Sequence, residues 1–484
     1  MSLVVGVDSS TQSTKVEVRR IDDGALVASG RASHPPTSPP RSEQDPNAWW
    51  EALVEAMTQI PADLRAAVTG ISIAAQQHGL VIADETLAPL RAAKLWNDTE
   101  SAAQAAALVE ARGAEWWANE VGLVPVASIT VTKLMWLARH EPERLRAARR
   151  CGLPHDWLTA RLTGRWTTDR GDASGSGWWS AKHGRRVPDA LAEVDVEPYA
   201  GWDNVLPEVL GPTEAAGELT KEAAADLGLR VSITVGPGTG DNMAAALGLG
   251  VRAGDVVISL GTSGTVYARA STATSDVTGV VAGFADATGQ HLPLVCTLNA
   301  TKVTDWVAAL QGVTADELAR RALEAPRGSN GAVCVPYFDG ERTPDRPDAT
   351  ATIAGLRTST TVADVARAAH EGVVCGLLDG LDALTAAGVR TDGRRLLIGG
   401  GARSAAFRQI TADVSAAAIV VPSVDDAEAV ALGAAVQAAA TTSSTDLDVV
   451  SGRWSATHPS ASVTPTAMDG SDVRDRFRQA AGVH

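Results

Sequence analysis

One strand-turn-strand pattern occurs twice in this chain, about half its length apart. In the first copy the apolar residues 3–7 precede a short polar stretch, residues 9–15. In the second copy the apolar residues 256–260 run into the glycine- and hydroxyl-rich residues 261–265 and then into residues 266–268. Each copy predicts a buried strand, a tight turn and a returning strand. Backbone N–H groups and hydroxyls in such turns can surround phosphate oxygens, so the pair predicts a site for the two ends of a triphosphate.

Two ordinary β-hairpins are the alternative interpretation, because turns of Gly, Ser and Thr are common. The residues around the first turn favour phosphate binding. Asp8 at the end of the first strand offers a carboxylate for Mg²⁺, and Lys15 adds a compact positive charge. We therefore predict a nucleotide site between two similar domains.

The composition fits a protein of two domains. The chain has 484 residues, which is longer than one hydrophobic core usually organises. Because 45% of the residues are hydrophobic, the chain can build two substantial cores. We expect domains at residues 1–238 and 239–484. The formal net charge of −15 argues against nucleic acid or an anionic membrane as a partner. Because residues 3–7 form a strand without a basic, apolar leader, and no apolar run has the length of a membrane span, we expect a cytoplasmic protein.

The four cysteines suggest neither zinc nor disulfides. They are scattered, without a C-x-x-C pair, so we expect buried, reduced thiols: Cys151, Cys296, Cys334 and Cys375.

The first half of the chain contains a candidate sugar pocket. Residues 3–28 predict a three-strand meander, Asp45 and Pro46 predict a helix start, and residues 68–75 predict a strand that ends at Gln76. Ligands of α/β sheets bind at strand ends. We expect a sugar or polyol pocket from four side chains in this loop and the next one: Gln77, His78, Trp96 and Asp98. A structural role for a lone histidine such as His78 is the alternative.

The candidate catalytic base is Asp241. Glycines at 236, 238 and 240 precede it, and residues 243–247 predict a helix, which places Asp241 at a helix N-terminus. An aspartate there can be only a cap. An alcohol kinase, however, needs a carboxylate that accepts the hydroxyl proton, and Asp241 is placed for that task.

Two further glycine-rich segments are less informative. Gly400 and Gly401 follow the apolar pair 396–397. Because glycine has no side chain, the base or ribose of a nucleotide could lie directly against the main chain there. Residues 171–177 predict a flexible turn without an assigned role. The chain has no Gly-Lys dipeptide, which excludes a P-loop.

These segments, in this order, resemble the FGGY family of carbohydrate kinases within the actin, Hsp70 and hexokinase-like superfamily. The resemblance runs from about residue 3 to about residue 440. It includes residues 128–140 with Lys133 and Trp136, residues 259–264, residues 340–344 and residues 399–404. It implies an α/β fold of two RNase H-like domains with a nucleotide and sugar cleft between them. It also implies ATP and Mg²⁺ as cofactors and is compatible with a homodimer.

Within the family the chain looks most similar to xylulokinases. This implies phosphorylation of the terminal hydroxyl of a ketopentose, D-xylulose first, with Asp241 as base and with Gln77, His78 and Asn242 at the sugar. It implies Mg²⁺ at Asp8 and adenosine at Gly400 and Gly401. The residues that would face the ATP phosphates are Thr11, Gln12, Lys15, Gly261 and Thr262.

Two departures leave the substrate open. Ser10 replaces a glycine usual in the first turn, which would restrict the approach of the backbone, and Gln77 replaces a Met found in many xylulokinases. Ribulose, gluconate or an alditol is an alternative substrate, and a catalytically silent sugar-binding regulator is the alternative class. The segment after residue 440 predicts an extension that becomes helical near residues 472–481.

Overall fold

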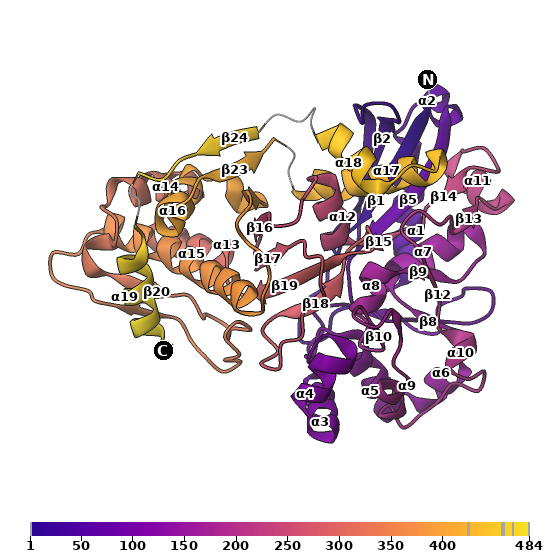
Figure 1. Cartoon of the computed structure of the whole chain (residues 1–484), viewed down its shortest axis with the longest axis horizontal. Helices are drawn as coiled ribbons and strands as arrows, with labels where there is room; N and C mark the ends of the chain where they lie inside the picture. Colours follow the sequence, from indigo (N-terminus) through magenta and orange to yellow (C-terminus); the bar gives the residue numbers. More distant parts are fainter. Residues whose placement is uncertain (1, 424–425, 456–459, 467–468, 483–484) are drawn as a thin grey trace. The chain divides into compact units, whose positions relative to one another are not determined.

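The computed structural model describes residues 2–423, 426–455, 460–466 and 469–482 (Figure 1). The chain forms two compact units, and the first is assembled from three separate segments: Met1–Gly250, Ser271–Leu292 and Ala427–Thr457. The second unit comprises Val251–Ala270, Pro293–Asp426 and His458–His484. The domain boundary between residues 238 and 239 stays a prediction. The two compact units have different bounds, because each is assembled from separate segments of the chain.

The strands of the first unit are β1 (Leu3–Ser9), β2 (Ser13–Arg20), β3 (Leu26–Ser33), β4 (Glu43–Gln44), β5 (Val68–Ala75), β6 (Val81–Ala83), β7 (Ala93–Lys94), β8 (Arg150–Gly152), β9 (Thr167–Asp169), β10 (Trp179–Ser180), β11 (Arg185–Arg186), β12 (Glu208–Leu210), β13 (Gly217–Glu218), β14 (Thr234–Val235), β15 (Thr239–Gly240) and β18 (Ala282–Ala285). Its helices are α1 (Pro46–Thr58), α2 (Ala62–Ala66), α3 (Ala102–Arg112), α4 (Ala114–Trp116), η1 (Trp117–Val121), α5 (Thr130–His140), α6 (Pro142–Ala147), α7 (Pro154–Thr163), α8 (Arg170–Ser174), α9 (Pro188–Ala192), α10 (Trp202–Val205), α11 (Lys221–Leu227), α12 (Asp241–Gly248), α17 (Asp426–Ser443) and α18 (Leu447–Ser455).

The main sheet of this unit has the order β13-β14-β5-β1-β2-β3, and β15 also pairs with β5. The antiparallel β1, β2 and β3 confirm the predicted meander. β5 is parallel to β1, to β14 and to β15. Parallel pairing brings the carboxyl ends of β1, β5 and β15 to one edge of the sheet.

Helices cover both faces of this sheet. On one face Val5 and Val7 join a buried core with Trp49, Leu53 and Met57 of α1, the predicted helical stripe. Asp45 caps this helix by accepting a hydrogen bond from the backbone N of Asn47 (3.0 Å). On the other face α17 lies against β1, as Figure 1 shows, and its backbone packs directly on Gly6. A return of the chain after residue 426 therefore completes the first unit.

Two local expectations need correction. Residues 171–177 are not a flexible turn, because α8 occupies part of this segment and all seven residues are buried. Asp169 caps α8 by accepting hydrogen bonds from the backbone N of Gly171 and Asp172. The Ser/Thr-rich stretch after residue 440 begins as the last turn of α17, because tertiary packing of this helix overrides the weak helix propensity of its threonines and serines.

The second unit contains β16 (Val256–Leu260), β17 (Gly264–Ala268), β19 (His291–Thr297), β20 (Val333–Val335), β21 (Thr352–Ala354), β22 (Arg395–Ile398), β23 (Ile419–Pro422), β24 (Ser460–Val463), α13 (Thr301–Gln311), α14 (Ala315–Glu324), η2 (Ser329–Gly331), α15 (Val362–Ala386), η3 (Gly400–Arg403), α16 (Ala405–Ser415) and α19 (Ser471–Ala481). Six strands of its sheet run in the order β19-β17-β16-β22-β23-β24. The long α15 packs against β17, and α19 packs on α15 and β20 with Phe477 buried. The predicted helix near residues 472–481 is thus confirmed.

The cysteine thiols are free, as expected. Cys151, Cys334 and Cys375 are buried, whereas Cys296 is only partly so. A search of the described residues finds no helix that is both long and apolar enough to cross a bilayer.

Candidate functional site

The predicted sugar and base residues of the first unit lie at one edge of its main sheet. In the strand register, Ala75 of β5 stands opposite Ser9 of β1 and Gly240 of β15. Gln76 and Asp241 each lie one residue beyond these paired strands, and Asp8 pairs with Ala74 of β5, which separates β1 from β15. Three parts of the chain separated by more than 60 residues are brought together by parallel pairing alone.

The Asn242 side chain joins the sugar loop to the candidate base. Its Nδ2 donates a hydrogen bond to Oε1 of Gln77 (2.9 Å) and another to Oδ1 of Asp241 (2.9 Å). Asp241 is the first residue of α12, and its Oδ1 also accepts from the backbone N of Asn242 (2.7 Å). Gly240 makes room for this arrangement, since a Cβ there would lie 2.6 Å from Cγ of Gln77. The structure thus links Gln77 and Asp241 through the side chain of Asn242.

His78 faces the same region in an unusual backbone conformation. Its φ is +63°, in the left-handed region that few residues with a side chain adopt. The imidazole lies 5.4 Å from the ring of Phe284, measured between centroids, and a Cβ on Gly175 would lie 2.5 Å from its Cε1. Packing holds His78 in this conformation, and its role at the sugar stays a prediction.

The first turn is tied to the same loops by side-chain hydrogen bonds. The backbone N of Ser10 donates to the carbonyl of Ser13 (3.0 Å), which closes the turn. Oγ1 of Thr11 donates to Oε1 of Gln76 (3.1 Å) and accepts from Nε1 of Trp96 (2.9 Å). Ser10 is not among the residues with positive φ, so its backbone conformation does not require the usual glycine.

Gln12 and Lys15 extend from the first turn. Gln12 is exposed, and Lys15 pairs through Nζ with Oε1 of the buried Glu17 (3.0 Å). Asp8 is almost fully buried at 4% exposure. Their roles at phosphate and metal stay predictions.

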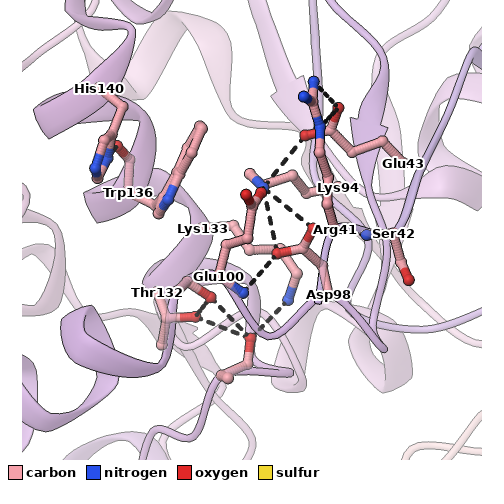
Figure 2. Close-up of polar contacts among 12 residues, drawn as sticks. Arg41, Ser42, Glu43, Lys94, Asp98, Glu100, Thr132, Lys133, Trp136 and His140 are labelled. Atoms are coloured by element: carbon pink, nitrogen blue, oxygen red, sulfur yellow. Dashed lines mark hydrogen bonds and ion pairs between the residues drawn. The ribbon is translucent and has the colours of Figure 1, made fainter. Parts of the chain in front are cut away.

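Asp98 belongs to a buried cluster of ion pairs around Lys94. It is fully buried, accepts from Nζ of Lys94 (3.1 Å to Oδ2) and from the backbone N of Ser42 (2.9 Å), as Figure 2 shows. Nζ of Lys94 also contacts Glu100 (2.5 Å) and Glu43 (3.2 Å). These contacts hold the loop of Trp96 around Lys94. The expectation that Asp98 binds substrate stays a prediction.

The surroundings of Lys94 are completed by an aromatic ring. Its Nζ lies 4.0 Å from the centroid of the Trp136 ring, which stacks on His140 (Figure 2). Burial raises the pKa of Glu43, but hydrogen bonds and charge from Arg91 and Arg41, with help from Lys94, bring it below its usual value. Lys133 donates to the carbonyls of Ala127 and Ser128 (3.1 and 2.6 Å) and so fixes the start of α5. Lys94 and Lys133 are therefore buried lysines that hold the loop of Trp96 and the start of α5, respectively.

The second unit gathers the other glycine-rich segments at the end of β16. In its turn the backbone N of Gly261 donates to the carbonyl of Ser263 (3.0 Å), and the backbone N of Thr301, the first residue of α13, donates to the carbonyl of Gly261 (3.0 Å). Thr262 is exposed. β22 is parallel to β16 and delivers the third glycine cluster beside it. A Cβ on Gly401 would lie 2.8 Å from Cβ of Leu260, so the two predicted nucleotide segments meet there. Gly400 is exposed to solvent.

Sequence reasoning missed several residues that shape the site. Gln44 donates to the carbonyl of Thr11 (2.9 Å) and Phe284 packs on His78, although neither belongs to a predicted motif. For Gln76 the sequence predicts only a position in the loop, whereas its Oε1 accepts a hydrogen bond from Oγ1 of Thr11. A buried lysine such as Lys94 has no local signature, because its partners come from β4 and from the following loop.

Both halves of the chain match models of one protein family. Residues 3–248 match the FGGY family of carbohydrate kinases, N-terminal domain, and residues 256–442 match the C-terminal domain of the same family. The chain belongs to the FGGY family of carbohydrate kinases. This family assignment confirms the predicted α/β fold and the predicted ATP-dependent kinase class.

Individual relatives match along nearly their whole length. A xylulose kinase of Streptomyces rubiginosus is 48% identical over 453 residues, which cover 93% of this chain and 90% of the relative. A xylulose kinase of Streptomyces coelicolor is 46% identical with the same coverage. The crystal structure of xylulose kinase from Bifidobacterium adolescentis superposes with a TM-score of 0.86 at 38% identity and covers 99% of each chain.

Proposed function

We propose that this FGGY kinase transfers the γ-phosphoryl group of ATP to the terminal hydroxyl of D-xylulose and releases D-xylulose 5-phosphate and ADP. The xylulose kinases among its near-full-length relatives support this substrate. The observation that carries the mechanism is the Asn242 amide, which holds the Gln77 side chain and the Asp241 carboxylate in one hydrogen-bonded array.

In this proposal Asp241 is the general base. Its carboxylate accepts the proton of the sugar hydroxyl while the hydroxyl oxygen forms a bond to the γ-phosphorus. The bond from this phosphorus to the β–γ bridging oxygen breaks, and ADP leaves. Gln77, His78 and Asn242 orient the sugar, and Trp96 supports the pocket through its hydrogen bond to Thr11.

The two turns serve the nucleotide in the same proposal. Thr11, Gln12 and Lys15 contact phosphate from the first unit. Gly261 and Thr262 contact phosphate from the second, where Gly400 and Gly401 receive the adenosine. Asp8 is a fitting ligand for Mg²⁺, because a carboxylate at the end of β1 is a hard oxygen donor. Bound Mg²⁺ would neutralise phosphate charge.

The test is an ADP-release assay with Mg-ATP and a panel of D-xylulose, D-ribulose, D-gluconate and alditols. We expect the highest kcat/KM with D-xylulose. Asp241→Asn keeps the size of the side chain and removes the base, so kcat should fall by about 10²–10⁴-fold. The surface variant Asp63→Asn, on α2 of the same unit, is the matched control and should keep full activity.

Three results would contradict the proposal. A better substrate than D-xylulose would move the specificity to another sugar and keep the kinase. Full activity of Asp241→Asn would remove Asp241 as the base. Sugar binding without turnover on the whole panel would favour a regulator.

A further inference from the structure

The loop between β19 and α13 supports the phosphate turn of the second unit. The backbone N of Ala300 donates to the carbonyl of Thr262 (3.1 Å), and the backbone N of Thr301 donates to the carbonyl of Gly261 (3.0 Å). A trans peptide group is planar, so a carbonyl that is held in place also fixes the N–H of the next residue, which points the opposite way. The loop therefore sets the direction of the N–H groups with which this turn would meet phosphate.

Two residues of this loop are bonded to one buried carboxylate. Glu341 belongs to the segment 340–344, and it is 3% exposed. Its Oε1 accepts from the backbone N of Leu298 (2.6 Å), and its Oε2 accepts from Nδ2 of Asn299 (2.9 Å). The same Nδ2 also donates to the carbonyl of Gly340 (2.7 Å). Glu341 thus holds the two residues that come directly before those bonded to the turn.

The Glu341 side chain is itself held in one position. Its Oε1 also accepts from the backbone N of Arg342 (2.8 Å). The backbone N of Glu341 donates to the carbonyl of Arg346 (2.9 Å), and the backbone N of Arg346 donates to the carbonyl of Glu341 (2.8 Å). Burial raises the pKa of Glu341, an effect that hydrogen bonds from Leu298, Asn299 and Arg342 partly offset. An ionised carboxylate only accepts hydrogen bonds, so an arrangement of three donors suits the charged form.

We propose that Glu341 is a positioning residue for the nucleotide. Its carboxylate holds Leu298 and Asn299, and the residues that follow them fix the peptide groups of the turn at Gly261 and Thr262. This inference rests on the proposed function, because that function assigns the turn to the phosphates of ATP. Glu341 acts on the nucleotide through the turn, so ATP affinity depends on a buried side chain from the loop between β20 and β21.

The test begins with Glu341→Gln, which keeps the size of the side chain. The new amide can keep its oxygen toward the backbone N of Leu298 and Arg342, but its NH₂ group then faces Nδ2 of Asn299. Rotation of the Asn299 amide would set its oxygen against the carbonyl of Gly340 instead. We expect the Kd of Mg-ADP, measured by isothermal titration calorimetry without sugar, and KM for ATP to rise about tenfold. KM for D-xylulose should stay within about twofold, a split that general destabilisation would not produce.

A second substitution tests whether Glu341 acts through this loop. Asn299→Ala alone removes the donor to Oε2 of Glu341 and should also weaken binding of Mg-ADP. Combined with Glu341→Gln, it removes the opposed amino group as well. The double variant should therefore bind Mg-ADP no more weakly than Glu341→Gln alone, because the two substitutions disrupt the same contact.

The matched control is the same substitution at another buried glutamate of the second unit. Glu371 is 4% exposed, accepts from the backbone N of Gly328 and from Oγ of Ser329, and pairs with Arg367. Glu371→Gln should lower the melting temperature, yet keep the Kd of Mg-ADP within about twofold of the unmodified protein. Thermal unfolding monitored by circular dichroism verifies that each variant folds.

The outcomes separate this inference from the proposed function. Unchanged affinity for Mg-ADP in Glu341→Gln, additive effects of Glu341→Gln and Asn299→Ala, or an equal loss of affinity in Glu371→Gln would overturn the inference. An unmodified protein that binds Mg-ADP but turns over no sugar would instead refute the proposed function, and the ADP affinities of the variants would still decide the role of Glu341.

Discussion

Replacement of Lys94 by Met tests whether the internal ion cluster stabilises the first unit. The ammonium group is fully buried and contacts Asp98, Glu100 and Glu43, at 3.1, 2.5 and 3.2 Å. Met keeps the apolar stem beside Trp136 but removes the charge. Glu43 retains Arg91 at 2.5 Å, whereas Asp98 and Glu100 lose their cation.

The loss of unfolding free energy in Lys94→Met follows from the carboxylates that stay buried without their cation. Removal of one partner from a buried ion pair typically costs about 3–5 kcal/mol, because the other charge stays buried without compensation. Loss of the contact between Nζ and the Trp136 ring, 4.0 Å from its centroid, adds to that cost. Asp98 still accepts hydrogen bonds from the backbone N–H groups of Ser42 and Glu100 in the variant. We therefore expect the free energy of unfolding to fall by about 4 kcal/mol.

Urea unfolding followed by circular dichroism measures this change at pH 8. The matched control is Lys302→Met, since its ion pair with Asp339 is largely exposed and should cost less than about 1 kcal/mol. A deficit below about 1 kcal/mol for Lys94→Met at pH 8 would refute the reasoning.

Three more predictions concern packing, pH and thiol reactivity. Gly6→Ala should destabilise the first unit by more than about 3 kcal/mol, or prevent folding, because its Cβ would lie 2.0 Å from the carbonyl oxygen of Ala431 in α17; unchanged urea unfolding would contradict this. The pKa of His155 is raised to about 9, so its stabilising contribution is complete below about pH 6.5 and is lost as pH rises through 9. The difference in unfolding free energy between the unmodified protein and His155→Gln should therefore shrink over that range, and a difference that grows would be inconsistent with a buried imidazolium. Burial raises the pKa of all four thiols, so Ellman's reagent should modify the native protein slowly and all four cysteines after denaturation; rapid reaction at Cys151 or Cys375 would show that the core opens.

Local patterns were sufficient to predict the elements that carry the site. The alternation and turn residues of 3–18 and 256–268 predicted two hairpins that the structure contains, and Asp45 with Pro46 predicted the start of α1. Asp241 was predicted at a helix N-terminus and begins α12. These features depend on neighbours in the sequence, such as caps, turn residues and hydrophobic period, so a single sequence is enough to read them.

Long-range packing decided the rest. The sequence does not show that Asp98 forms a buried ion pair with Lys94, four residues earlier. Residues 171–177 read as a flexible glycine turn, but Asp169 and the surrounding core make them a buried helix. Neither outcome has a local signature, because the free energy of a buried charge depends on which distant groups the fold places around it. The sequence by itself therefore determined the elements and the kinase chemistry they bring, whereas tertiary structure alone decided which polar groups meet, as His155 and Asp172 do in the interior of the first unit.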